Sequence, residues 1–311
     1  MSVKINIAAF DTLIDEARAK FRMLVSSNPG LFGGQANLLV EASIGNNASR
    51  GTIGIPQGVD VSSSEGLMAA VDLTLLDRNA PMSELEKISQ RAKDEAVATV
   101  CVYPEHVSIV QRITGGNPPP IAVVGFPYVI DPLSAVEATL EQTRTAIQSG
   151  ATEIDMVLAM NFKDGNPDYA AHYNYLHQVI TAAGSSGIPV KVILETAYLT
   201  DEQKVEASLL AKMAGAAFVK TSTGFAKEDL MRPGTPKTQK GATPYDVALM
   251  RRTVGDTTLD NQNRKIPMGV KASGGIRNRE QAIAVYQAGA SRIGASGGID
   301  VRGTSAKVGN Y

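Results

Sequence analysis

Two lysines stand inside short apolar segments, and each is followed at once by a turn rich in serine, threonine and glycine. Lys220 lies in the string AFVKTSTG, and Lys271 lies in MGVKASGG. A charged lysine in an apolar strand is unfavourable unless it is paired with an acid or gives up its proton. Burial and a second nearby cation both lower the pKa of an amine. A lysine pair at one site therefore predicts an amine that forms a Schiff base with a carbonyl near neutral pH.

Other reactive side chains hold similar positions in neighbouring apolar segments. Asp72, Cys101, Asp155 and Glu195 stand at or near the carboxyl ends of such segments, and Lys191 stands near the start of one. The lysines could be purely structural and paired with these acids, or they could be catalytic. Two lysines at one rim, with acids at the same level, favour catalysis. Cys101 has no His nearby and is predicted to be a barrel-wall residue, whose position at the rim leaves it able to contact substrate or to react with an electrophile.

Glycines follow the same segments, in the strings TSTG, SGGI and GASGG. Loops at these positions bind phosphate through backbone amides in many α/β barrels. Tight turns from strand to helix also require glycine, so both interpretations stay open. No spacing of His, Asp and Glu resembles a metal site, and a single cysteine excludes a cysteine-rich zinc site.

Eight apolar runs rich in β-branched residues are expected to be the strands that position these groups. Continuous apolar runs are typical of strands buried on both faces of a parallel sheet. The runs are 69–73, 98–103, 121–126, 153–158, 190–195, 217–221, 268–272 and 292–295. Eight β-then-α units over residues 66–311 predict an α/β fold, a (β/α)8 TIM barrel. A doubly wound open sheet is the alternative, but no strand–GxGxxG–helix unit opens the chain.

Segments with helical periodicity separate the strands, at 81–97, 131–149, 168–185, 201–214, 243–254 and 278–287. Ser83 and Glu86 predict a capping box, and the pair Asp131-Pro132 predicts a helix start. Glycines 150, 215 and 289 predict helix ends that lead into the next strand. The irregular stretch 225–242 is predicted to be an exposed loop at the catalytic face.

Residues 1–65 precede the first strand and are predicted to be an N-terminal extension. The pattern of residues 11–25 predicts an amphipathic helix, and residues 26–64 are rich in Gly, Ser and Asn. We expect this extension to pack on the barrel or on a neighbouring subunit, which makes a homo-oligomer one expected assembly. The barrel and a C-terminal tail then occupy residues 66–311.

The composition bounds the classes of partner. The 311 residues carry 30 Lys+Arg against 31 Asp+Glu, a formal charge of −1, which argues against nucleic acid as the main partner. No run of 18 apolar residues predicts a transmembrane helix, and the N-terminus shows no signal peptide. The expected location is the cytoplasm, and the expected partners are small molecules.

Motifs along the barrel segment resemble one enzyme family. VDLTLL (71–76), ATVCVYP (98–104), EIDMV (153–157), KVILET (191–196), FVKTSTG (218–224), GVKASGGIR (269–277) and RIGAS (292–296) occur in order. Together they resemble the 2-deoxyribose-5-phosphate aldolases, which are class I aldolases with a barrel fold. The resemblance implies reversible cleavage of 2-deoxy-D-ribose 5-phosphate to acetaldehyde and D-glyceraldehyde 3-phosphate, with no cofactor or metal.

The resemblance also assigns roles to residues. Lys220 matches the Schiff-base lysine, and Lys271 matches the neighbour that lowers its pKa. Asp155 matches the residue that relays protons with Lys271 and a water, and Tyr311 matches a tail tyrosine that protonates the enamine. The implied substrate-binding positions are Asp72, Thr74, Cys101, Lys191, Thr223, Gly224, Gly274, Gly275, Ser296 and Gly297.

Two positions depart from the family pattern. The residue after KTSTG is usually a lysine that helps to hold phosphate, and here it is Phe225; the usual Ser or Thr after GAS is here a glycine, in GASGGI. These changes predict weaker phosphate selection with catalysis retained. The alternatives are a related Schiff-base aldolase that prefers another or an unphosphorylated aldehyde, and a non-catalytic barrel that binds sugar phosphates.

Overall fold

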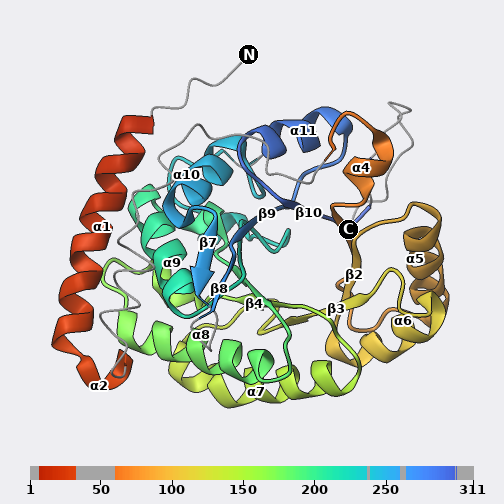
Figure 1. Ribbon diagram of the computed structural model, residues 1–311, viewed down its shortest axis with the longest axis horizontal. Helices are drawn as coiled ribbons and strands as arrows, with labels where there is room; N and C mark the ends of the chain where they lie inside the picture. The colour runs from red at the N-terminus through yellow and green to blue at the C-terminus, as the bar shows by residue number, and fades with distance from the viewer. Residues whose placement is uncertain (1–6, 33–59, 237–238, 260–263, 298, 300–311) are drawn as a thin grey trace.

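Eight parallel strands close into a barrel in this computed structural model, which describes residues 7–32, 60–236, 239–259, 264–297 and 299 (Figure 1). Their order around the barrel is β1-β10-β9-β6-β5-β4-β3-β2. They are β1 (Val71–Thr74), β2 (Thr99–Val102), β3 (Pro120–Val124), β4 (Ile154–Val157), β5 (Val190–Ile193), β6 (Phe218–Lys220), β9 (Gly269–Ser273) and β10 (Arg292–Ala295). All eight predicted strands are present. The barrel closes where Val71 pairs with Ile293, so the open-sheet alternative is wrong.

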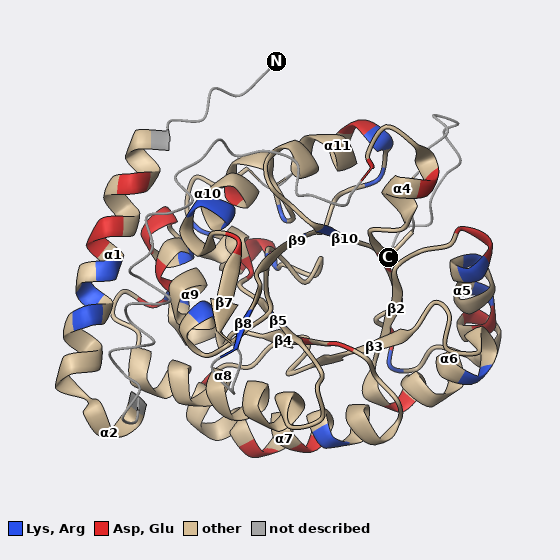
Figure 2. Cartoon of the chain, viewed as in Figure 1, with Lys and Arg blue, Asp and Glu red and all other residues tan. Residues whose placement is uncertain are grey.

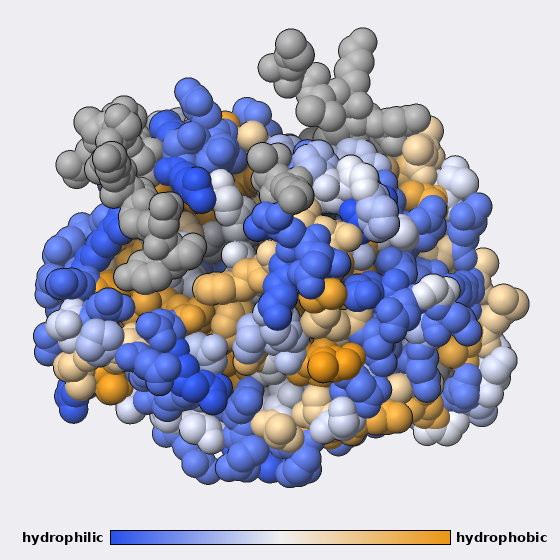
Figure 3. Space-filling view, turned by 180° about the vertical axis from the view of Figure 1, so that it is seen from behind, coloured by the Kyte–Doolittle hydropathy of each residue, from blue (hydrophilic) through white to orange (hydrophobic). Residues whose placement is uncertain are grey.

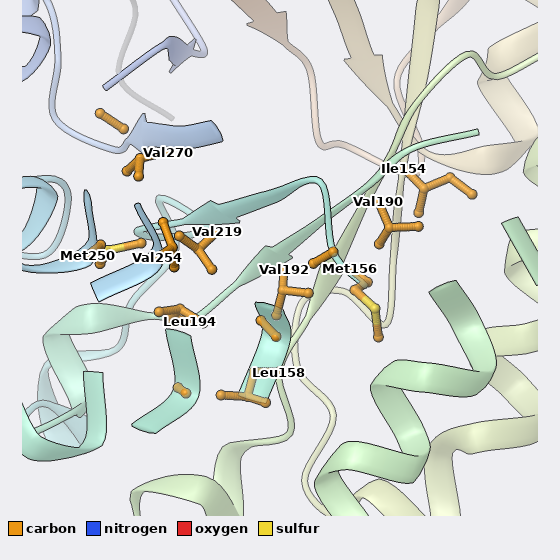
Figure 4. Close-up of a cluster of buried hydrophobic side chains, with 14 of the residues drawn as sticks. Ile154, Met156, Leu158, Val190, Val192, Leu194, Val219, Met250, Val254 and Val270 are labelled. Carbon is orange, nitrogen blue, oxygen red and sulfur yellow. The ribbon is translucent and has the colours of Figure 1, made fainter. Parts of the chain in front are cut away.

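Strand periodicity separates two kinds of side chain. Alternate residues of a strand point to opposite faces, and those of β4, β5 and β6 follow this rule. Apolar side chains such as Ile154, Val192 and Val219 belong to the core packed beneath the helices (Figure 4). The intervening positions, among them Asp155 and Lys220, carry the charged groups, which meet inside the barrel.

Helices surround the barrel and account for all six predicted helical segments (Figure 1). The α-helices are α1 (Ile7–Ser27), α2 (Pro29–Phe32), α4 (Ser64–Met68), α5 (Met82–Asp94), α6 (Val107–Thr114), α7 (Pro132–Gln148), α8 (Tyr169–Gly184), α9 (Asp201–Met213), α10 (Pro244–Val254) and α11 (Arg279–Gln287). The 3-10 helices are η3 (Pro104–His106), η4 (Met160–Lys163), η5 (Thr196–Tyr198) and η6 (Glu228–Leu230). Helices α2, α4 and α6 were not predicted; α2 and α4 have only four and five residues, too few to show a period.

The helix ends follow the predicted signals with one exception. Asp131 accepts a hydrogen bond from the Ser134 amide at 3.0 Å, directly before Pro132. Glycines 150, 215 and 289 have φ of 93°, 95° and 107°, the left-handed conformation that glycine reaches without strain. The capping box of Ser83 and Glu86 is wrong, because α5 begins at Met82 and its N-cap is Pro81. Ser83 therefore lies inside the first turn.

A two-stranded antiparallel sheet stands outside the barrel and was not predicted. Its strands are β7 (Thr257–Leu259) and β8 (Lys265–Pro267), between α10 and β9. Each has only three residues, and β8 is exposed, so neither shows an apolar run. The loop predicted at 225–242 is mostly exposed, and it contains the short helix η6.

The predicted N-terminal helix is present as α1, which packs along the outside of α9 and α10 (Figure 1). It begins four residues earlier than predicted, and its buried residues include Phe10 and Phe21. Lys20 Nζ lies 2.7 Å from Glu206 Oε1 on α9. Residues 33–59 of the predicted extension lie outside the described residues, so the domain boundary at residue 65 stays a prediction.

Charged side chains lie on the outer helices and also on the barrel strands (Figure 2). Hydrophilic residues cover much of the rear face, with apolar patches between them (Figure 3). Among the described residues, no helix has the length and apolar character needed to cross a membrane.

Candidate active site

The carboxylate of Asp155 lies at the centre of the barrel and accepts bonds from three lysines. Lys191 Nζ lies 2.8 Å from Oδ1, while Lys220 and Lys271 each place Nζ 2.8 Å from Oδ2. The three lysines come from β5, β6 and β9, so neighbouring strands deliver them to one point. All four side chains are buried. The structure thus brings together three of the four predicted catalytic residues, Lys220, Lys271 and Asp155.

Asp72 on β1 provides a second buried carboxylate. Its Oδ2 lies 2.5 Å from Lys271 Nζ and 3.7 Å from Lys191 Nζ. Its Oδ1 accepts bonds at 2.7 Å from Arg292 Nη1 and from the Thr99 hydroxyl. Asp72 and Lys191, both predicted from the sequence, therefore belong to the same network.

Glu153 and Arg292 complete this network and were not predicted. Glu153 Oε2 lies 2.5 Å from Lys191 Nζ, and Glu153 Oε1 lies 3.3 Å from Arg292 Nη2. Glu153 stands two residues before Asp155, on the same face of its strand, and this spacing was the signal available in the sequence. We call the whole set the barrel cluster: Asp72, Glu153, Asp155, Lys191, Lys220, Lys271 and Arg292.

The charges of the barrel cluster single out Lys220. Three carboxylates balance only three of the four basic groups. Burial lowers the pKa of Lys220, the carboxylate of Asp155 raises it, and the charge of Lys271 lowers it again, so that the net shift is downward. Burial lowers the pKa of Lys271 as well, but the adjacent carboxylates of Asp155 and Asp72 raise it, and the net shift is upward. The pKa of Lys191 is raised in the same way, against its burial.

The two aspartates are held ionised by these cations. Burial alone would raise the pKa of Asp155, but the charges of Lys191, Lys220 and Lys271 hold it well below its usual range. The pKa of Asp72 is likewise lowered, by Lys271, Lys191 and Arg292. The arrangement therefore favours charged aspartates and a charged Lys271, and of the three lysines it disfavours the charged form only at Lys220.

Cys101 and Thr74 lie side by side on β2 and β1, where they are register partners. The Thr74 hydroxyl donates a bond of 3.1 Å to the Asp72 carbonyl. The Cys101 thiol is fully buried, and burial raises its pKa to about 11. This environment disfavours the thiolate, and with it the reaction with an electrophile that the sequence suggested.

The turn that follows Lys220 is fixed by its threonines. Thr221 Oγ1 bonds the backbone of Ser273 on β9, accepting from the amide at 3.0 Å and donating to the carbonyl at 3.1 Å. The Thr223 amide donates to Glu195 Oε2 at 3.1 Å, and the Thr223 hydroxyl donates to the same oxygen. The substrate-binding candidate Thr223 is therefore already engaged by an acid at the end of β5.

The three glycines after β6 and β9 form turns, and two of them border open space. Gly224, Gly274 and Gly275 have φ of 90°, 87° and 78°, so each needs glycine for conformational reasons. A Cβ at Gly224 or Gly275 would meet no atom within 4 Å. These features agree with the tight-turn interpretation and leave room for a ligand.

The remaining predicted positions lie near the C-terminal end of the chain. Ser296 is exposed after β10. The Gly297 carbonyl accepts a bond of 2.6 Å from Arg91 Nη1. Tyr311 lies outside the described residues. Among those residues, no group of three His, Cys, Asp or Glu side chains gathers as metal ligands would.

A closed parallel barrel with a buried lysine pair defines an enzyme of the α/β-barrel class. A model of the DeoC/LacD family aldolases matches residues 60–305, and the chain belongs to this family.

Proteins similar to this chain in sequence and in structure are named deoxyribose-phosphate aldolases. The chain is 42% identical over 234 residues to the deoxyribose-phosphate aldolase of Thermoanaerobacter pseudethanolicus, covering 74% of this chain and 93% of that protein. It is 39% identical over 247 residues to the deoxyribose-phosphate aldolase of Methanothermobacter thermautotrophicus, covering 78% and 96%. The tetrameric deoxyribose phosphate aldolase of Aeropyrum pernix superimposes with a TM-score of 0.63 at 28% identity, over 78% of this chain and 94% of that one.

Proposed function

We propose that this protein is a class I aldolase that reversibly cleaves 2-deoxy-D-ribose 5-phosphate to acetaldehyde and D-glyceraldehyde 3-phosphate. One observation carries the proposal. Of the three lysines bonded to Asp155, only Lys220 has no second carboxylate partner among the described residues. Its pKa is accordingly lowered, while the pKa values of Lys191 and Lys271 are raised. A nucleophilic amine must be unprotonated, and burial beside a cation favours that state. The names of relatives about 40% identical to this chain support the substrate assignment.

The proposed reaction begins with attack of Lys220 Nζ on the aldehyde carbonyl of the open-chain sugar. The carbonyl oxygen is protonated to give a carbinolamine, and loss of water gives a protonated imine. That cationic nitrogen accepts the electron pair of the C2–C3 bond when the C3 hydroxyl loses its proton. Glyceraldehyde 3-phosphate leaves, and the enamine of acetaldehyde stays on Lys220.

The enamine is then protonated at its terminal carbon, and water hydrolyses the resulting imine to free acetaldehyde and Lys220. We assign proton transfer during dehydration and cleavage to Asp155 and Lys271, acting through a water molecule. Support comes from their shared contact, since Asp155 Oδ2 lies 2.8 Å from both Lys220 Nζ and Lys271 Nζ. Tyr311 is assigned the protonation of the enamine carbon.

The proposed substrate-binding residues lie around these groups. Asp72, Thr74, Cys101 and Lys191 would face the reacting end of the sugar. The phosphate would be held by the turns after β6, β9 and β10, with contributions from Thr223, Gly224, Gly274, Gly275, Ser296 and Gly297. The imine serves as the electron sink, so this chemistry calls for no metal or organic cofactor.

The proposal extends to location and assembly. We propose a cytoplasmic enzyme that acts on small aldehydes and sugar phosphates and that assembles as a homo-oligomer. The tetrameric Aeropyrum pernix enzyme is a precedent for such assembly.

Borohydride trapping tests the central assignment. Incubation with acetaldehyde and borohydride should reduce the imine to a stable secondary amine and add a two-carbon group to the peptide that contains Lys220. Lys220→Met should remain unlabelled and should not cleave deoxyribose 5-phosphate. Labelling of Lys271 or Lys191 instead would reassign the nucleophile, and binding of the sugar phosphate without labelling or cleavage would favour the non-catalytic barrel.

A second candidate is a related aldolase that prefers an unphosphorylated aldehyde. The position after KTSTG carries Phe225, whose ring packs edge to face on Phe126 with centroids 5.3 Å apart. Phe126 in turn packs on Tyr103 at 5.7 Å. Phe225 is 43% exposed while Phe126 and Tyr103 are buried, so Phe225 presents an apolar ring at the position where the resemblance implies a cation.

A further inference from the structure

Glu195 is a buried acid at the end of β5 that the proposed reaction does not use. Its side chain is held in the protein interior, with only 8% of the residue exposed. Its backbone has φ 58° and ψ 63°, the left-handed conformation that costs a non-glycine residue free energy. A buried acid on a strained backbone position persists when its surroundings fix it there.

The contacts of Glu195 lead directly to the turn after Lys220. Its Oε2 accepts bonds from both the amide and the hydroxyl of Thr223. The same Thr223 hydroxyl oxygen accepts a bond of 3.0 Å from the Phe225 amide. One hydroxyl thus donates to Glu195 and accepts from Phe225, which links three residues in a chain of hydrogen bonds.

The turn is held from both sides. Thr221 bonds the backbone of Ser273 on β9, and Thr223 bonds Glu195 after β5. Strands β5 and β9 are the two neighbours of β6, the strand that ends at Lys220. The Thr221 bond secures the part of the turn next to the lysine, and the Glu195 bond secures the part that ends at Gly224.

Unpartnered polar atoms gather around this turn. Glu195 Oε1, Ser222 Oγ and Ser273 Oγ are buried and have no hydrogen-bond partner within the part of the chain that the structure describes. Buried polar groups are nearly always bonded, so three such atoms in one place call for an explanation, and a polar group of a bound molecule is one that fits a proposed substrate turn. Gly224 follows Ser222 by two residues, and a Cβ there would enter open space.

We propose that Glu195 is a positioning residue that, through Thr223, sets the turn 221–225 for the half of the substrate that becomes the aldehyde acceptor. This inference rests on the proposed aldolase function. It assigns Glu195 to the binding of the sugar phosphate and separates it from imine formation, which uses Lys220 and Asp155. This separation is expected because Glu195 bonds Thr223, which lies three residues beyond the nucleophile Lys220.

The test is a double-mutant cycle of Glu195→Ala and Thr223→Val. Loss of an acceptor shared by two donors should raise the KM for deoxyribose 5-phosphate about 10-fold in E195A, with a smaller change in kcat. Borohydride trapping of acetaldehyde at Lys220 should stay within about twofold of wild type. In the T223V background, E195A should raise KM no further, because the residue through which it acts is gone.

Conservative and control variants separate positioning from general damage. Glu195→Gln keeps an acceptor oxygen in place, so its KM should return to within about threefold of wild type. Glu86→Ala changes an exposed glutamate on α5 and should leave both readouts unchanged. Glu195→Met removes the acceptor but retains the volume, and it replaces E195A in the cycle if the alanine variant unfolds.

Distinct outcomes overturn the two proposals. An equal rise in KM on removing Glu195 with and without Thr223 would refute the positioning role. So would a loss of imine trapping in E195A as large as its loss of cleavage, or an unchanged KM. If the wild-type protein itself traps no acetaldehyde at Lys220, the aldolase proposal fails, whatever the cycle shows.

Discussion

Lys220 and Lys271 are register partners on the adjacent parallel strands β6 and β9, and both Nζ atoms lie 2.8 Å from the same oxygen, Oδ2 of Asp155. One carboxylate oxygen cannot neutralise two adjacent cations. Lys271 has a second acid within reach, because Asp72 Oδ2 lies 2.5 Å from its Nζ. Asp155 is the only carboxylate paired with Lys220 among the described residues. The asymmetry explains why the pKa of Lys220 is lowered while that of Lys271 is raised.

Replacement of Lys271 by Met should therefore raise the pKa of Lys220. The substitution removes a nearby positive charge, and it also leaves Asp155 Oδ2 to Lys220 alone. Each unit of increase reduces the free-amine fraction about 10-fold at a pH below the pKa. The rate of imine trapping with acetaldehyde, measured from pH 6 to 10, should shift to higher pH. Lys87→Met on the exposed face of α5 is the control. An unchanged trapping profile with lost turnover would limit Lys271 to proton transfer.

Tyr311→Phe should slow proton exchange at the methyl carbon of acetaldehyde and spare imine formation. The phenol hydroxyl is the proposed acid and base for that carbon, and a positioned acid or base contributes about 100-fold or more. Lys220 would still form the imine, since its proposed proton relay uses Asp155 and Lys271. Deuterium uptake into acetaldehyde from heavy water, measured beside borohydride trapping, separates the two steps. Equal deuterium uptake in the Phe variant would leave Tyr311 without a catalytic role.

The barrel could be predicted from the sequence because each of its strands is a continuous apolar run. The positions of Lys220 and Asp155 followed from the same runs, since alternate residues of a buried strand face the barrel interior. The ion pair of Glu153 with Arg292 could not be predicted this way. It joins strands separated by 139 positions in sequence, and only the closed barrel brings the two side chains within 3.3 Å.

Local rules failed where tertiary contacts decided the outcome. Ser83 and Glu86 have the spacing of a capping box, but the helix starts two residues too early for Ser83 to be the N-cap. Glu195 was recognised as an acid at a strand end, but its bonds to Thr223 depend on the pairing of β5 with β6. The sequence gives no sign of which threonine of KTSTG an acid will hold.

Glu195→Gln should change how stability depends on pH. Burial raises the pKa of Glu195 to about 7, although bonds from Thr223 oppose the shift, whereas an unfolded glutamate titrates at about 4.3. The folded protein therefore binds this proton more tightly than the unfolded chain does. The stability that the protonated Glu195 contributes is fully present below the unfolded pKa and is lost as the pH rises through the folded pKa of about 7.

Glutamine has no such proton, so E195Q should gain stability relative to wild type between pH 5 and pH 7 and show a constant difference above pH 8. Urea unfolding at a series of pH values measures the difference in free energy. A difference independent of pH across this range would mean that Glu195 titrates alike in the folded and unfolded states.

Phe225→Lys should restore preference for the phosphorylated sugar. A hydrogen bond to a charged group contributes about 1.5–3 kcal/mol, which corresponds to a 10- to 150-fold change in the ratio of kcat/KM for deoxyribose 5-phosphate and deoxyribose. The Phe225 backbone is already fixed by its bond to Thr223, so a lysine there would begin from a defined position. Phe225→Leu removes the contact with Phe126 without adding charge, and it should leave the ratio nearly unchanged.

A gain in both variants would attribute the effect to loss of the aromatic ring. No gain in the lysine variant would point to another cation, and Lys227, whose Nζ lies 4.7 Å from the Tyr128 ring centroid, would be the next to replace.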